Sequence, residues 1–246
     1  MNMTHKLLGV LLVLGAVGMT LPLFAEGNKQ MVEATKTQQV PFQPGGTIHL
    51  NRSYGHLAIE GWDRPEVEIV VTRTLNQLAT AKEQAEAAKR LDAVGIAVER
   101  RSDTDLEITT TLPHHSRWTH PFGSTGGVTV EYRILVPRDS RLVIRHGTGD
   151  VLVTGVTADI EAQGHAGDIV LLLPESGQYA IDAKSKIGTV WSDFDGDFQR
   201  RHLTGIRYAH PAAAPSRRIY LRMGVGGIAI KGSPREAQPP AAPGVQ

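Results

Sequence analysis

Apolar residues occupy every second position in many short runs of this chain. Alternation over a few residues is typical of strands that place one face against a core and the other in water. Gly, Pro, Asp and Asn bound the runs, as expected for turns between strands. The clearest runs are 47–50, 55–61, 67–71, 96–98, 106–108, 128–134 and 142–144. The pattern predicts an all-β protein.

One segment, residues 76–92, departs from the alternation. It is rich in Ala, Glu, Lys and Gln, which favour helices. Apolar residues recur near helical spacing at Leu75, Leu78, Ala81, Ala85, Ala88 and Leu91. This spacing predicts one amphipathic helix of about four turns. We interpret it as an accessory helix that covers an otherwise exposed sheet edge.

A glycine-led motif recurs along the chain, with the pattern Gly, any residue, apolar, any residue, apolar. Copies begin at Gly55, Gly149, Gly167 and Gly226, and a degenerate copy begins at Gly188. Tight turns need a positive φ and stacked turns need close backbone approach, and glycine permits both. The Asp after the glycine, Asp150 or Asp168, can accept hydrogen bonds from turn amides. We therefore expect Gly-Asp turns between short strands.

The strands near these copies follow a step of nine residues. Leu142, Val151, Ile160 and Ile169 are each nine residues apart, so two steps return the chain near its starting point after 18 residues. Self-similarity at a fixed period marks repeat architectures, and here it predicts a β-solenoid-like stack of short strands. A two-sheet β-sandwich is the alternative, because steps of nine also fit consecutive antiparallel strands. Two irregular inserts, 114–127 and 194–217, interrupt the pattern, and binding residues often lie in such loops.

The N-terminus has the three parts of a secretory signal peptide. Lys6 gives a basic start, residues 7–20 are uncharged and apolar, and Ala25 is a small residue at the expected cleavage point. An uncleaved anchor is the alternative, but the apolar run is short for a spanning helix and contains Pro22. We expect export to the periplasm or the extracellular space, with no transmembrane anchor after cleavage.

The rest of the chain divides by composition. After the signal peptide at 1–25, we expect a flexible tether at 26–38, a single β-repeat domain at 39–233 and a disordered Pro/Ala-rich tail at 234–246. The chain has 26 basic and 25 acidic side chains, and the loss of Lys6 leaves 25 of each. This balance gives no general attraction to nucleic acid. The chain has no cysteine, which excludes disulfides, thiolate zinc sites and a lipid anchor on a cleavage-site cysteine.

Histidines occur in two places that bear on metal binding and pH sensing. His114, His115 and His120 lie close together in the first insert, but their spacing matches no established pattern of metal ligands. His146 and His165 each precede a Gly-Asp turn. We interpret these two as a surface pair rather than a pH-sensitive cluster.

Other chemical motifs are weak. Residues 193–197 combine three aspartates with a glycine, as calcium loops do, but lack the spacing and closing glutamate of an EF-hand. We interpret these aspartates as caps of a strand turn. No nucleophile elbow, zinc-protease motif or phosphate-binding loop is present. The sequence therefore predicts no catalytic, cofactor-binding or metal-binding residue, and no enzyme.

The order of several pieces is similar to that of a known bacterial family. GHLAIEGWD at 55–63 leads into EVEIVVT at 66–72, and the predicted helix, the strand VTVEYRILVP at 128–137 and the Gly-Asp copies from Gly149 follow. Over residues 40–233 this order resembles the Toastrack domain family, whose members carry the label "putative adhesin". The resemblance implies a β-solenoid-like fold in an exported protein, often associated with envelope-stress systems. It brings no catalytic residue.

Three functions are consistent with this pattern. The first is a non-enzymatic exported protein of the cell envelope that presents a rigid β surface to another protein, with a role in envelope maintenance or stress. The second is a glycan-binding module, which would need Trp62, Trp118 and Trp191 on one exposed face. The third is a carbohydrate-active enzyme, which would need acidic residues clustered on one face. The partner is thus an envelope protein or a glycan, and the sequence sets no oligomeric state.

Overall fold

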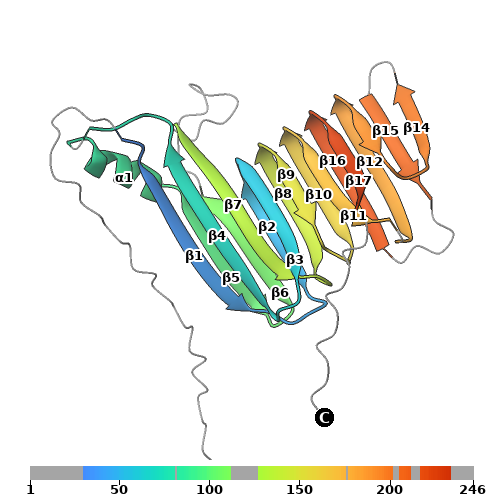
Figure 1. Ribbon diagram of the computed structural model, residues 1–246, viewed down its shortest axis with the longest axis horizontal. Coiled ribbons are helices and arrows are strands. Elements are labelled where there is room, and N and C mark those ends of the chain that lie inside the picture. Colours follow the sequence, from blue (N-terminus) through green and yellow to red (C-terminus); the bar gives the residue numbers. More distant parts are fainter. Residues whose placement is uncertain are drawn as a thin grey trace, which may run out of the picture.

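The computed structural model describes residues 30–80, 82–111, 127–175, 177–201, 205–211 and 217–233. This part of the chain folds into strands β1–β17 and one helix, α1 (Gln84–Asp92) (Figure 1). The strands form two mixed sheets, one of eight strands and one of nine, which confirms the all-β class. No helix within these ranges has the length and apolar character needed to cross a membrane.

The two sheets form two layers, and the strands at the centre of each sheet are parallel. The eight-stranded sheet has the order β1 (Glu33–Pro41), β4 (Glu66–Leu75), β7 (Val128–Pro137), β3 (His56–Trp62), β9 (Val151–Thr154), β11 (Ile169–Pro174), β17 (Ile228–Ser233) and β13 (Val190–Ser192). The nine-stranded sheet has the order β14 (Asp197–Arg201), β15 (Gly205–His210), β12 (Tyr179–Ile187), β16 (Arg217–Val225), β10 (Ile160–Ala166), β8 (Arg141–Thr148), β2 (Thr47–Ser53), β6 (Asp105–Thr111) and β5 (Gly95–Ser102).

Each nine-residue step takes the chain from a strand of one sheet to a strand of the other sheet. β8 lies in the nine-stranded sheet, β9 in the eight-stranded sheet, and β10 and β11 repeat the alternation. As a result, residues 18 positions apart pair in parallel strands: Leu142 pairs with Ile160, and Val151 pairs with Ile169. Each buried position therefore stacks on an equivalent position of the next strand pair.

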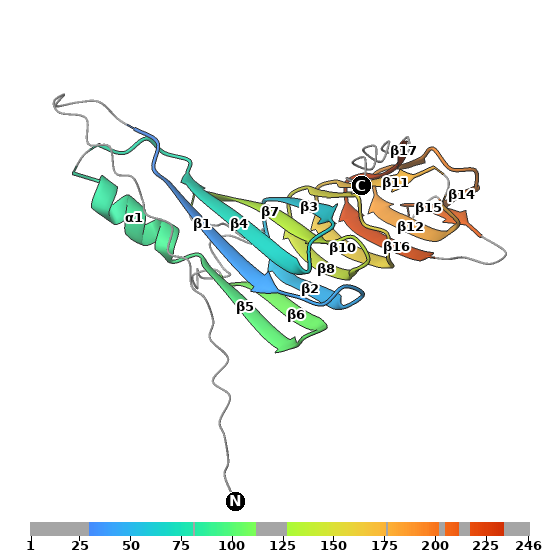
Figure 2. The same cartoon turned by 60° about the horizontal axis from the view of Figure 1, so that its bottom comes forward.

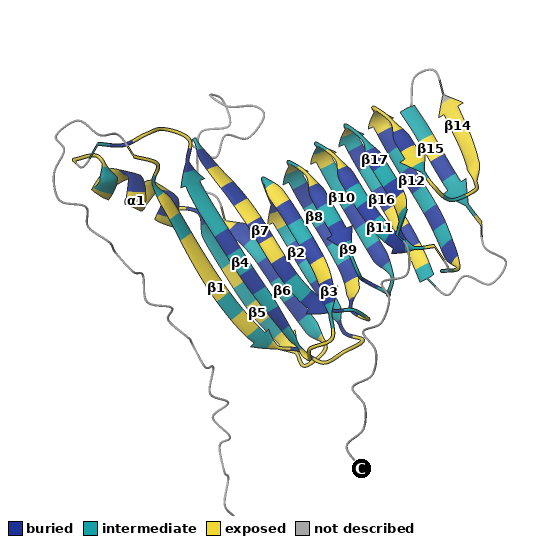
Figure 3. Ribbon diagram, viewed as in Figure 1, coloured by how far each residue is buried: buried dark blue, intermediate teal, exposed yellow. Residues whose placement is uncertain are grey.

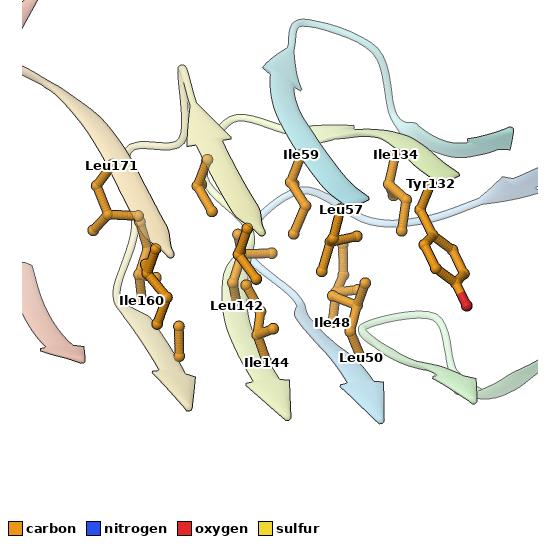
Figure 4. Close-up of a cluster of buried hydrophobic side chains, with 14 of the residues drawn as sticks. Ile48, Leu50, Leu57, Ile59, Tyr132, Ile134, Leu142, Ile144, Ile160 and Leu171 are labelled. Atoms are coloured by element: carbon orange, nitrogen blue, oxygen red, sulfur yellow. The ribbon is translucent and has the colours of Figure 1, made fainter. Parts of the chain in front are cut away.

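The core lies between the sheets. Buried and accessible positions alternate along the strands, as Figure 3 shows. Figure 4 shows side chains from both sheets meeting in one layer, among them Ile48, Leu50, Leu142 and Ile144 from one sheet and Leu57, Ile59 and Ile134 from the other. Burying one such side chain stabilises the fold by about 1.5–3 kcal/mol, so this layer is the main source of stability.

A column of glycines runs along one side of the stack, where the chain passes between the sheets. Gly55, Gly149, Gly167, Gly226 and Gly188 all have positive φ. A Cβ on Gly149 would lie 2.0 Å from the carbonyl oxygen of Gly55, and one on Gly167 would lie 2.1 Å from that of Gly149. The expected reasons for glycine, positive φ and close backbone approach, both hold at these turns.

The aspartates that follow Gly149 and Gly167 each bind the neighbouring turn. An Asp150 Oδ1 atom accepts a hydrogen bond from the amide of Asp168 at 3.0 Å, and Asp168 Oδ1 accepts one from the amide of Gly227 at 2.6 Å. These bonds satisfy turn amides that the strands leave free, as expected from the sequence.

The helix is shorter than the sequence predicted. α1 begins only at Gln84; before it, Ala79 forms a β-bridge with Gln30, and Leu78 is 55% exposed. The helix buries only Ala87 and Leu91 and packs against β1 and β4, at one edge of the eight-stranded sheet. The prediction of 76–92 was therefore too long, because backbone pairing with residue 30 holds the first part of that segment extended.

Part of the expected tether is a strand. Residues 33–38, assigned to the flexible tether 26–38, belong to β1, which pairs antiparallel with β4 along its whole length. Two inward positions of β1 are the polar residues Lys36 and Gln38, so the strand has little apolar alternation. Ala34 and Val40 pack against the core on either side of these polar residues, and backbone pairing with β4 continues along the whole strand.

The second insert also contains strands. Within 194–217, β14 and β15 form an antiparallel pair that extends the nine-stranded sheet beyond β12. The chain then returns, and β16 lies between β10 and β12, parallel to both. The order of strands in space therefore differs from their order in the chain.

Candidate interaction surface

The outer faces of the two sheets differ in character. On the eight-stranded sheet, one row of outward positions is apolar on five adjacent strands: Ala58, Leu152, Val170, Ala229 and Trp191 stand in register. Leu172 lies two positions after Val170 on the same side of β11. We call these six residues the apolar face. Their neighbours along each strand, such as Leu171, are buried against the other sheet, so the apolar face points outward.

The most exposed member of the apolar face is Trp191, at the edge strand β13. Its side chain is 49% exposed. The ammonium group of Lys231 lies 6.0 Å from the centre of its ring. Around the apolar residues, Glu60, Thr154 and Lys231 occupy outward positions one row further along the strands. The face therefore has an apolar centre and a mixed polar margin.

The outer face of the nine-stranded sheet is charged. Arg145, Gln163, Arg222, Lys184 and Arg207 stand in one row on adjacent strands. Arg145 pairs with Glu161 at 2.7 Å, and both Arg207 and Arg222 pair with Asp182 at 2.9 Å. Burial raises the pKa of the Asp182 carboxyl, but the hydrogen bonds from Arg207 and Arg222 outweigh burial and hold the pKa below its ordinary value.

Alternation does not predict the apolar face, although the sequence carries another signal for it. Residues 169–173 read IVLLL, five apolar residues in succession. A continuous apolar run in a strand indicates that both of its faces are apolar. Val170 and Leu172, the second and fourth residues of this run, belong to the apolar face.

A groove lies at the end of the molecule opposite to Trp191, where β1 and β4 face β5 across the space between the sheets. Figure 2 shows the two sheets separated here, next to α1. The groove has a volume of about 310 Å³ and an apolar floor that includes Ile69, Val71, Ile96 and Val98. Arg73 closes one end by donating hydrogen bonds to the carbonyls of Leu91 and Val94 at 3.1 and 3.2 Å.

His146 and His165 do not form a surface pair. His146 is 6% exposed and points into the core, where its Nδ1 atom and the hydroxyl of Ser53 are joined by a hydrogen bond of 2.8 Å. His165 is exposed on the outer face of the same sheet. The prediction was wrong because His146 is an even-numbered residue of β8, like the buried Leu142 and Ile144, whereas His165 has the outward parity of β10.

We predict that His146 makes the fold sensitive to acid. Burial lowers the pKa of its ring to about 4. Between pH 6.5 and 4 the unfolded chain therefore binds a proton that the folded chain does not, so stability present above pH 6.5 is lost as the pH falls. Between pH 7 and pH 5 we expect wild type to lose about 2 kcal/mol more than His146→Gln in urea unfolding. An equal loss in both proteins would contradict this role.

The motifs considered for metal binding have separate outcomes. His114, His115 and His120, with Trp118, lie outside the described residues. Asp193 follows the end of β13, and its Oδ2 atom accepts a hydrogen bond from the amide of Gly232 on the neighbouring strand β17 at 2.9 Å. In the described ranges, no three His, Cys, Asp or Glu side chains are grouped so that they could hold a metal ion.

The described tryptophans do not share a platform. Trp62 lies on β3 and donates a hydrogen bond to the carbonyl of Glu66 at 2.8 Å, while Arg64 stacks 4.9 Å from its ring. Trp191 lies on β13, and three strands separate β3 from β13. At about 4.8 Å per strand the two rings are on the order of 20 Å apart, too far to hold one sugar between them.

Comparison with known proteins adds likenesses but no family. No protein-family model and no curated protein matches the sequence. A "putative cell adhesion protein" from Clostridium sporogenes is 16% identical over 81% of this chain and 100% of its own, with a TM-score of 0.48. "Putative adhesins" from Bacteroides fragilis and Parabacteroides merdae are each 9% identical, over 80% and 81% of this chain and 97% and 79% of their own, with TM-scores of 0.23 and 0.24. Likenesses this low transfer no site residue.

Proposed function

We propose that this protein is a non-enzymatic, exported component of the bacterial envelope that binds another protein through the apolar face. The observation that carries the proposal is the row of apolar residues across five adjacent strands on an outer surface. Apolar side chains in contact with water lower the free energy when a partner covers them. The opposite sheet has charged residues at the equivalent outward positions, so the apolar row is not a general property of the fold.

The expected partner has a surface that matches this one. An apolar centre with a polar margin is the usual composition of a protein interface. Trp191 is suited to act as an anchor, since exposed tryptophans often contribute a large share of binding energy. Glu60 and Lys231 at the margin favour a partner with charges of both signs around an apolar centre. Strands that are hydrogen-bonded to neighbours in a sheet offer a rigid surface that needs little reordering on binding.

The location of the protein is part of the same proposal. The signal-peptide pattern at 1–25 supports export, and the absence of cysteine fits an oxidising compartment. We further propose that the parallel centre of the two sheets is a β-solenoid-like stack, in line with the resemblance to the Toastrack family. A role in envelope maintenance or stress rests on that resemblance. A glycan-binding role has less support, because Trp62 and Trp191 lie apart.

The proposal is tested by capture of the partner with a double variant of the apolar face. The tagged full chain is crosslinked in the envelope of the cells that produce it, and captured proteins are identified by mass spectrometry. Leu152→Lys with Val170→Lys places two charges at the centre of the face. We expect capture of the specific partner to fall by about tenfold or more, because interface centres tolerate charge poorly.

The matched control is Val143→Lys, a half-buried outward valine on the nine-stranded sheet. This variant should capture the partner as wild type does. Equal capture by all three proteins would overturn the proposal. Sedimentation of the purified chain identifies a second copy as the partner, if wild type forms a dimer that the double variant does not.

A further inference from the structure

A basic hollow lies on the outer face of the nine-stranded sheet, away from the apolar face. It spans three adjacent strands, β10, β16 and β12, and has a volume of about 180 Å³. Gly164 and Met223 also line it, and we define the basic hollow by its polar side chains and Gly224: Gln163, His165, Lys184, Lys186, Arg222 and Gly224. Nothing in the proposed protein-binding role uses these residues.

A glycine forms the floor of the hollow. Gly224 lies between His165 and Lys186 on the neighbouring strands, because the residues on either side of it pair in register with theirs. A Cβ at Gly224 would lie 2.4 Å from the carbonyl oxygen of His165, so this position carries no side chain. The missing side chain leaves an open space between one imidazole and one ammonium group.

The charges around the hollow are only partly compensated. Glu161 pairs with Arg145, and Asp182 pairs with Arg207 and Arg222. Lys184 and Lys186, by contrast, have no acidic partner among the described residues. Two like charges two positions apart on one strand repel each other, and an anion between them would remove the repulsion.

Arg222 is held in place beside these lysines. Its Nη1 atom donates to the carbonyls of Asp182 and Leu221 at 2.9 and 2.8 Å, and Nη2 donates to the Asp182 carboxylate at 2.9 Å. The guanidinium also stacks over the ring of Tyr220 at 3.7 Å. A fixed cation costs little entropy when it binds a ligand, so Arg222 supplies a positioned positive charge.

We propose that the basic hollow binds a phosphate group. Lysine, arginine and histidine nitrogens are donors that suit a phosphate oxygen, and bonds between charged groups are the stronger hydrogen bonds. Two uncompensated lysines match the two negative charges of a phosphate better than the single charge of a carboxylate. The volume equals that of about six water molecules, enough for one phosphate group but not for an element of a protein.

The phosphate comes either from free inorganic phosphate or from a phosphate-bearing polysaccharide, and the test separates the two. The full chain is titrated with sodium phosphate at constant ionic strength, and backbone amide shifts are followed by NMR. We expect shifts centred on residues 163–165, 184–187 and 222–224. A phosphate-bearing polysaccharide and the same polymer after dephosphorylation are then titrated in the same way.

Two variants with equal loss of charge make the test specific. In the double variant Lys184→Gln with Lys186→Gln, we expect the affinity for phosphate to fall by about tenfold or more, since two charge-assisted contacts are lost. Lys82→Gln with Lys89→Gln removes two exposed lysines near α1 and should bind as wild type does. Thermal unfolding of each variant confirms that it is folded.

Shifts that are absent, spread over the whole surface, or unchanged in the Lys184/Lys186 variant would overturn the proposal. Tighter binding of the phosphorylated polymer, per phosphate, than of inorganic phosphate assigns the site to a glycan. Equal binding per phosphate assigns it to the free anion. Neither result bears on the apolar face, which is on the other sheet.

Discussion

Replacing Gly167 by valine should lower the free energy of unfolding by about 4 kcal/mol or more, which corresponds to about 10 °C in Tm. Two costs add at this position. Gly167 has a φ of +122°, which is strained for a β-branched residue. The new Cβ would also lie 2.1 Å from the carbonyl oxygen of Gly149, and backbone atoms of a stacked turn cannot move away without separating β9 from β11.

Gly127 offers a control for the first of these costs alone. Its φ is +81°, and a Cβ there would meet no atom within 4 Å. Gly127→Val should therefore cost only the backbone strain, about 1–3 kcal/mol. The two variants are compared by thermal and urea unfolding. If both lose the same stability, close approach within the glycine column is not what requires glycine at Gly167.

The second large effect distinguishes the two sides of β11. Leu171 is fully buried, so Leu171→Lys should destabilise the protein by more than about 5 kcal/mol and leave little folded protein. Val170, the preceding residue, belongs to the apolar face. Val170→Lys should change stability by no more than about 1 kcal/mol, because its side chain reaches water. Urea unfolding of both variants measures the contrast.

This contrast bears on why the apolar face exists. If Val170→Lys unfolds the protein as Leu171→Lys does, the outward valine contributes to folding and its apolar character needs no partner. If Val170→Lys is stable, the fold does not require an apolar residue there. The apolar residue then serves a surface that is covered by something other than this domain.

Much of the fold follows from local rules that the sequence displays. Alternation predicted strands at 47–50, 55–61 and 142–144, and each is found in a strand whose inward residues are buried. The step from Leu142 to Ile160 predicted that these residues stack, and they pair directly. Such features are predictable because each depends on a few neighbouring residues and on the two-residue period of a strand.

Other features depend on pairing between distant parts of the chain. The polar inward residues Lys36 and Gln38 interrupt the apolar alternation of β1, so its strand is established by pairing with β4. Likewise, β16 follows β14 and β15 in the chain but lies between β10 and β12 in the sheet. No local pattern specifies which two strands a returning strand lies between, so this order was not predictable.

The candidate surfaces show the same limit. Val170 and Leu172 were visible in a continuous apolar run, but their alignment with Trp191 depends on strand order. The basic hollow depends on it more strongly, because His165, Gly224 and Lys186 come from three strands that are adjacent only in the folded sheet. The sequence shows which residue types are present, but it does not show which of them the folded sheet brings together into a site.

Site-specific photo-crosslinking in the producing cells tests whether the apolar face contacts a protein. A benzophenone amino acid is placed at position 170 on the apolar face and, in a second chain, at position 143 on the opposite sheet. We predict a discrete crosslinked protein product from position 170 and none from position 143. No product from position 170, or the same products from both positions, would contradict it.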